Sequence, residues 1–182
     1  FAELARCIEL ELRGHGMTVQ LCDSNEDAKL EAQLLPQMLG RRLDGAIVAP
    51  VGISSPELRK TIESAAMPIV LIDRIPPKLD LPTVSLDNAH AGQLATNQLL
   101  KTGHRRIGVL RGEGKSFTDQ QRHQGVLQAL GKAGADINPQ WIAGCGYTRA
   151  DSVRAARKIL SSRPGPDSLI ALSGQGILGI LD

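Results

Sequence analysis

The sequence predicts an α/β fold in which parallel sheets carry helices on both faces. Short apolar runs alternate with stretches of helical periodicity along the whole 182-residue chain. Such alternation is typical of βαβ units, whose parallel strands are buried on both faces. The same pattern repeats on either side of residues 83–88. Two similar doubly wound halves would leave a cleft between them at the carboxyl ends of their strands.

Glycine, proline and capping residues divide the first half into six elements. Gly14 and Gly16 end the first helix, and Asp23, Ser24 or Asn25 can cap the second. Pro56 lies near the first turn of the third helix. The predicted elements, in chain order, are helix 4–12, strand 17–22, helix 26–39, strand 43–49, a helix from about 54 that ends before Met67, and strand 69–72.

The second half continues the alternation after a proline-rich segment, 75–82, that predicts no regular element. Gly103 and Gly134 follow the ends of two helices, where glycine is favoured. The predicted elements are strand 83–86, helix 88–102, strand 106–110, helix 118–133, strand 141–145, helix 150–161, strand 168–172 and a helix from Gly174.

Composition argues against several classes of protein. A net charge of +2 and short basic pairs at 41–42 and 105–106 do not form the basic patch of a nucleic-acid-binding domain. Cys7, Cys22 and Cys145 are odd in number and widely spaced, which favours reduced thiols in a cytoplasmic protein. No apolar run is long enough to cross a bilayer. The chain begins at Phe1 without Met, so we expect a truncation.

Two glycine-containing motifs resemble nucleotide sites. Residues 174–179 form G-x-G-x-x-G after a strand. However, the motif follows the last strand and no ribose-binding acid comes after it, so we favour a strand-to-helix turn over a dinucleotide site. Residues 112–116 lack the Walker A spacing. Backbone donors with Lys115 and Ser116 could hold an oxygen-rich ligand such as a phosphate, or the segment is a solvated loop.

No catalytic set or metal site is predicted, because the four histidines are not spaced as ligands. Asp73 and Asp87 each follow an apolar strand. A carboxylate at such an end can accept hydrogen bonds from sugar hydroxyls, or it can cap a helix. We favour the ligand role for Asp73 and the cap for Asp87.

Several stretches together resemble the effector domain of LacI/GalR-type repressors, and the resemblance covers essentially the whole chain. The block Gly103-His-Arg-Arg-Ile-Gly-Val-Leu110 after Val84-Ser-Leu-Asp-Asn88 is its most specific part. The other matching stretches are 72–77, 91–100, 117–130 with Arg122 and Gly125 in R-x-x-G spacing, and 167–179.

The resemblance implies a type I periplasmic-binding-protein-like fold with two Rossmann-like parallel-sheet subdomains and a ligand cleft. It implies an N-terminal subdomain over 1–87 without its first strand, and a C-terminal subdomain over 88–182 without its last elements. Where strands are missing, we expect exposed sheet edges. Members of the family also carry an N-terminal helix-turn-helix DNA-binding region, which we do not expect within residues 1–182.

The resemblance also implies a ligand-binding set. Arg122 matches the family's most regular ligand residue, and a guanidinium can hold vicinal hydroxyls or a carboxylate. Ser173 and Gly174 stand where many members carry Asn and Asp, which leaves the ligand class open. The other implied ligand residues are Asp73, Arg74, Thr118 and Tyr147. We expect Arg122→Ala to abolish ligand-induced stabilisation with little loss of stability.

The predicted function is that of the effector sensor of a cytoplasmic, homodimeric repressor, and not that of an enzyme. The effector would be a sugar, a sugar phosphate or a purine-like molecule, and operator DNA would bind through the helix-turn-helix region. No cofactor is expected. One alternative is a periplasmic sugar-binding protein of the same fold. Another is a nucleotide-dependent oxidoreductase, which would rest on residues 174–179.

Overall fold

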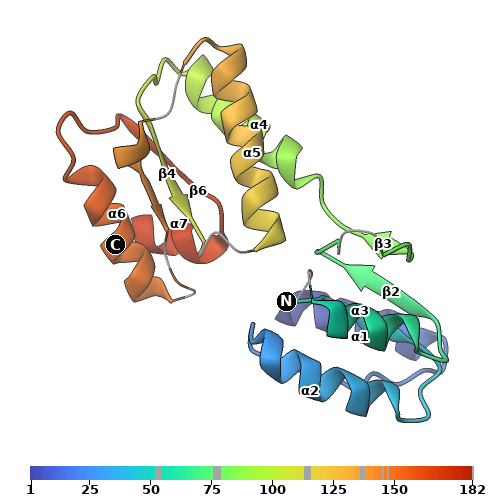
Figure 1. The fold of residues 1–182 in the computed structure, drawn as a ribbon. Helices are drawn as coiled ribbons and strands as arrows, with labels where there is room; N and C mark the ends of the chain where they lie inside the picture. The colour runs from blue at the N-terminus through green and yellow to red at the C-terminus, as the bar shows by residue number, and fades with distance from the viewer. Residues whose placement is uncertain are drawn as a thin grey trace. The chain divides into compact units, whose positions relative to one another are not determined.

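The chain forms seven α-helices and six strands in the residues that its computed structural model describes, which are 1–51, 55–75, 79–112, 116–135, 138–144, 146 and 148–181 (Figure 1). The elements are α1 (Ala2–Gly14), α2 (Ala28–Leu39), β1 (Ala46–Val48), α3 (Pro56–Glu63), β2 (Ile69–Ile72), β3 (Thr83–Val84), α4 (Asn88–Lys101), β4 (Ile107–Arg111), α5 (Phe117–Lys132), the 3₁₀ turn η1 (Pro139–Trp141), β5 (Ile142–Gly144), α6 (Arg149–Leu160), β6 (Ser168–Ala171) and α7 (Gly174–Ile180).

The chain divides into two compact units. Unit 1 comprises Phe1–Val70 with Pro76–Leu81, and unit 2 comprises Leu71–Ile75 with Pro82–Asp182. β2 therefore begins in one unit and ends in the other. The subdomain boundary between residues 87 and 88 stays a prediction.

Unit 1 contains α1, α2, β1 and α3, close to their predicted positions. Asp27 caps α2 by accepting hydrogen bonds from the N–H groups of Lys29 (2.7 Å) and Leu30 (3.2 Å). The helix thus begins after the predicted caps at 23–25. Ser55 caps α3, with Pro56 in the first turn as predicted.

The strand predicted over residues 17–22 is wrong. This segment has no regular secondary structure, and Leu21 is among the most exposed large apolar side chains of the described residues. Alternating hydrophobicity is a local property, whereas a strand needs the backbone of a neighbour to satisfy its N–H and C=O groups. Residues 17–22 are not part of either sheet that the structure describes.

Two three-stranded sheets have the orders β1-β2-β3 and β5-β4-β6. β2 and β3 run parallel, with Leu71 opposite Thr83 and Ile72 opposite Val84. β4 runs parallel to both β5 and β6. The predicted parallel sheets are therefore confirmed for these pairs. β5 and β6 form the two edges of the second sheet as the structure describes it.

The core of unit 2 lies on both faces of β4, where Ile107, Val109 and Leu110 are almost fully buried. Alternate side chains point to opposite faces of a strand. Ile107 and Val109 accordingly pack with Val126 and Leu130 of α5, while Leu110 packs with a second cluster around Ala155, Ala156 and Ile159 of α6. Helices α4 and α5 lie on one side of this sheet, and α6 and α7 lie on the other (Figure 1).

Helices α4 and α5 approach each other through two glycines. A Cβ atom on Gly125 would lie well under 3.0 Å from the carbonyl oxygen of Ala89 in α4. A Cβ atom on Gly92 would lie equally close to the carbonyl oxygen of Arg122 in α5. Only glycine allows this approach, so these two residues set the spacing between the helices that carry Asn88 and Arg122.

Candidate ligand-binding site

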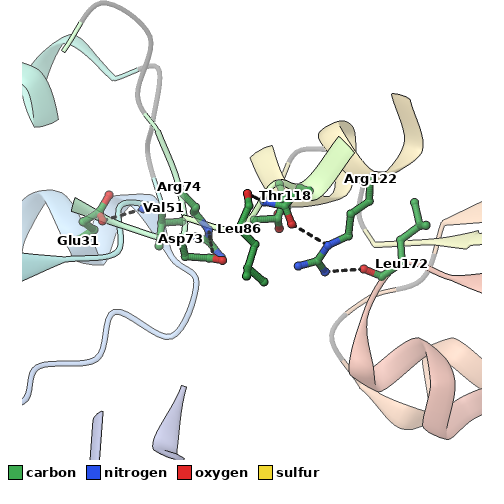
Figure 2. Close-up of polar contacts among 10 residues, drawn as sticks. Glu31, Val51, Asp73, Arg74, Leu86, Thr118, Arg122 and Leu172 are labelled. Carbon is green, nitrogen blue, oxygen red and sulfur yellow. Dashed lines mark hydrogen bonds and ion pairs between the residues drawn. The ribbon is translucent and has the colours of Figure 1, made fainter. Parts of the chain in front are cut away.

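Two hydrogen bonds hold the Arg122 side chain of α5 in a fixed direction. Its Nε donates to Oδ1 of Asn88 (2.8 Å). Its Nη1 donates to the carbonyl oxygen of Leu172 (2.7 Å), and Figure 2 labels both residues of this second bond. Asn88 begins α4, and Leu172 directly follows β6. The guanidinium therefore joins α5 to α4 and to the carboxyl end of β6. The carboxyl ends of parallel strands are where α/β units bind ligands.

A cavity of about 210 Å³ lies beside Arg122. Its lining is mostly small and apolar, and Arg122 supplies its positive charge. The lining residues are Ala91, Gly92, Ala95, Arg122, Ile170, Ala171, Leu172, Ser173, Gly174 and Ile177. Two of the predicted ligand residues, Arg122 and Ser173, thus contact the same space. An apolar cavity with a few directed polar groups is the usual form of a small-molecule site.

Asn88 is a site residue that sequence reasoning did not single out. Only 3% of its surface is exposed, and its amide makes two hydrogen bonds. Nδ2 donates to the carbonyl oxygen of Leu86 (3.1 Å), while Oδ1 accepts from Arg122. The available signal was its place in the Val84-Ser-Leu-Asp-Asn88 block. The neighbouring Asp87 accepts the N–H of His90 (2.8 Å), so its predicted role as a helix cap is confirmed.

Ser173 is the N-cap of α7, because its Oγ accepts the N–H of Gly176 at 3.1 Å. The hydroxyl can still donate a hydrogen bond to a ligand while its oxygen caps the helix. Two further predicted ligand residues, Tyr147 and Lys115, lie outside the residues that the structure describes.

The predicted residues of the β4–α5 loop form a small hydroxyl cluster. Ser116 and Thr118 share a hydrogen bond between Oγ and Oγ1 (2.8 Å), and Thr118 is buried. Asp119 fixes the start of this loop: it accepts two hydrogen bonds from Arg111 (3.0 and 2.7 Å) and one from the N–H of Gly112 (2.7 Å). A buried carboxylate with three donors is strongly held. Asp119 is a second residue that sequence reasoning missed.

His123 lies one helical turn after Asp119. Burial lowers the pKa of His123 below its ordinary value of 6.5, and the charge of Arg111 lowers the pKa further, against the opposing effect of Asp119. Burial and the charge of Arg111 therefore both favour the neutral form of the His123 imidazole.

Asp73 and Arg74 follow β2 with an unusual backbone. Asp73 has a φ of +66°, in the left-handed region that Asp tolerates better than most residues. Its N–H donates to the carbonyl oxygen of Val84 (2.9 Å), which fixes the turn to β3. The Asp73 carboxylate lies 3.7 Å from Nε of Arg74, and Arg74 is buried. Figure 2 draws the two side chains next to each other. Their ligand roles stay predictions.

The G-x-G-x-x-G motif at residues 174–179 has a packing explanation. A Cβ atom on Gly179 would overlap Ser152 of α6, and one on Gly176 would press against Ala171 and Ser173. These two glycines allow α7 to lie against α6 and the end of β6. The interpretation as a strand-to-helix turn accounts for the motif without a nucleotide.

Comparison with known proteins identifies the family of the chain. A sequence model described as "Periplasmic binding proteins and sugar binding domain of LacI family" matches residues 1–181. The chain belongs to this family. The predicted fold class is confirmed, since solved structures of transcription regulators superpose on the whole chain, including one described as a sugar-binding transcriptional regulator of the LacI family.

Three relatives illustrate the match to this LacI-related family. The maltose regulon regulatory protein MalI of Escherichia coli K12 is 30% identical over 90% of the chain and 48% of its own length. The repressor CytR of the same organism is 30% identical over 100% of the chain and 53% of its own length. The crystal structure of a Burkholderia thailandensis protein assigned as a ribose operon repressor is 30% identical, with a TM-score of 0.87 over 100% of this chain and 66% of that one.

The chain spans about half the length of the curated relatives it matches. Among the described residues, no helix is both long and apolar enough to cross a membrane. The same part of the chain contains no group of three or more side chains suited to hold a metal ion.

Proposed function

We propose that this chain is the effector-sensing domain of a transcription repressor that binds operator DNA through a separate helix-turn-helix region. The observation that carries the proposal is the fixed guanidinium of Arg122 beside the cavity at the end of β6. The relatives MalI and CytR, both named as regulators, support the regulatory role. The domain acts by binding and not by catalysis, in a cytoplasmic homodimer.

The effector is a small molecule with neighbouring hydroxyl groups or an anionic group. Arg122 uses two of its five N–H groups on protein acceptors, and in the part of the chain that the structure describes Nη2 donates to none. A guanidinium with spare donors suits vicinal hydroxyls, a carboxylate or a phosphate. Sugars, sugar phosphates and purine nucleosides all offer such groups. Ser173, Thr118 and Asp73 supply further polar contacts.

The mechanism is a linkage between effector and DNA. Residues 1–87 and 88–182 act as two subdomains, and the effector favours one of their relative orientations. In the dimer, that orientation changes the spacing of the DNA-binding regions. Coupling requires that the effector bind the two orientations with different affinity. An effector with equal affinity for both would leave the equilibrium between the two orientations unchanged.

A melting-temperature screen of the full-length protein against sugars, sugar phosphates and purines tests the effector role. We expect one chemical class to raise the melting temperature, because a ligand that binds only the folded state at 100 times its Kd stabilises that state by about 2.7 kcal/mol. A nicotinamide dinucleotide included in the same screen should give no shift. If no sugar, sugar phosphate or purine stabilises the protein at millimolar concentration, the effector role is wrong.

A further inference from the structure

We infer that Asn88 is a positioning residue for the effector-binding guanidinium of Arg122. The inference rests on the proposed function for the role of Arg122, but the contact itself is independent of any ligand. Asn88 need not touch the effector. It acts by holding Arg122 in the direction in which the remaining donors are available.

Helix capping does not explain the Asn88 side chain. Asp87 already caps α4 through the N–H of His90. The Asn88 amide instead spans two segments that are distant in sequence: Nδ2 donates to Leu86, and Oδ1 accepts from Arg122, 34 residues away. An amide buried to this degree must make its hydrogen bonds inside the protein, because an unpaired buried polar group is costly.

The direction of the amide is fixed by chemistry. The Leu86 carbonyl oxygen can only accept, so the NH₂ group of Asn88 must face it, and Oδ1 must face the other way. Nε of Arg122 can only donate, which matches Oδ1. The two bonds therefore reinforce one orientation of Asn88, and this orientation in turn fixes one edge of the guanidinium.

The packing of the two helices keeps Asn88 within reach of Arg122. Gly92 and Gly125 bring α4 and α5 into backbone contact next to these residues. The carbonyl oxygen of Leu172, directly after β6, accepts the second hydrogen bond from Arg122. The guanidinium is therefore held from two sides. Because the guanidinium is held before ligand arrives, less conformational entropy is lost on binding.

Modification of arginine by phenylglyoxal, applied to the full-length protein without effector, tests the positioning role. Mass spectrometry gives a separate modification rate for each arginine-containing peptide. Asn88→Ala removes one charge-assisted hydrogen bond, and we expect the rate at Arg122 to rise about five- to tenfold. Arg111, which is held by Asp119 on the same side of α5, should keep its rate.

Two matched variants distinguish a specific loss of the Arg122 orientation from a general loosening of the protein around α4. Asn88→Asp keeps an acceptor for Nε but loses the donor to the Leu86 carbonyl oxygen, so Arg122 should be modified faster than in wild type but clearly more slowly than in Asn88→Ala. Thr96→Ala removes another buried polar side chain of α4, whose hydroxyl donates to the carbonyl oxygen of Gly92 in its own helix (2.8 Å). This variant should leave Arg122 protected. If Asn88→Ala does not yield folded protein, Asn88→Ser, which is too short to reach Nε, replaces it.

Three results would overturn the inference. They are an unchanged rate at Arg122 in Asn88→Ala, an equal rise at Arg111, or the same rise at Arg122 in Asn88→Asp or Thr96→Ala. None of these results bears on whether an effector exists, because the modification experiment is carried out without one. Failure of the melting-temperature screen would instead overturn the proposed function and leave the positioning contact intact.

Discussion

Replacing Arg122 with alanine removes the rise in melting temperature that the effector identified by the screen gives, and it also lowers the melting temperature of the free protein. The first effect follows from the loss of the charge beside the cavity. The second follows from the contacts of Arg122, because Asn88 Oδ1 and the Leu172 carbonyl oxygen both lose their donor. Leaving a buried acceptor unpaired costs about 1–3 kcal/mol. The measurement is the melting temperature of full-length wild type and variant, with and without the compound.

This expectation differs from the one based on sequence, which was that Arg122→Ala would cost little stability. A lysine at this position keeps a charge but cannot reproduce two bonds in fixed directions, so Arg122→Lys should also lose most of the shift. Arg154→Ala is the control, because Arg154 is an exposed residue of α6 that pairs with Asp151. An Arg122→Ala protein that keeps the full shift would exclude Arg122 from the site.

Replacing Gly125 with alanine destabilises the protein by about 3 kcal/mol, the upper end of the usual range for overpacking. The added methyl group would overlap the backbone of Ala89, and backbone cannot move aside as the end of a flexible side chain can. The helices must separate, which also moves Arg122 away from Asn88. We therefore expect Gly125→Ala to weaken effector binding as well. Urea denaturation of the full-length protein, followed by circular dichroism, measures the loss.

Gly131 provides the matched control within the same helix. A Cβ atom there would meet nothing within 4 Å. Gly131→Ala should therefore stabilise the protein by up to about 1 kcal/mol, because alanine favours the helix more than glycine. Equal denaturation midpoints for the two alanine variants would contradict the close approach of α4 and α5.

The fold could be predicted from sequence because its signals are local and repeated. Apolar strands such as 69–72 and 107–110 alternate with periodic helices, and glycine or proline separates them. The same reasoning failed at 17–22, where the pattern favours a strand but pairing decides whether one forms. It also placed the α2 cap too early. Asn25 and Glu26 have positive φ angles of 50° and 59°, and the helix begins only after Asp27.

The candidate site was predictable only in part, because its contacts join distant segments. Arg122 and Ser173 were predicted and line one cavity. The partners that orient Arg122 are 34 and 50 residues away, and nothing in local periodicity indicates them. The role of Asp119 depends likewise on the path of the loop back to Arg111 and Gly112. For residues 174–179, the sequence favoured a strand-to-helix turn over a dinucleotide site, and the close packing of Gly179 against Ser152 accounts for one of the glycines.

The most direct test of the proposed function is the affinity of the full-length protein for DNA, measured with and without effector. A duplex selected by the protein from a random pool serves as the operator, and fluorescence anisotropy gives its Kd at fixed salt concentration. We expect the compound that raises the melting temperature to change this Kd by at least about fivefold, the lower end of typical allosteric coupling. Arg122→Ala should bind the same DNA without responding to the compound. An unchanged Kd for wild type at saturating compound would contradict the account.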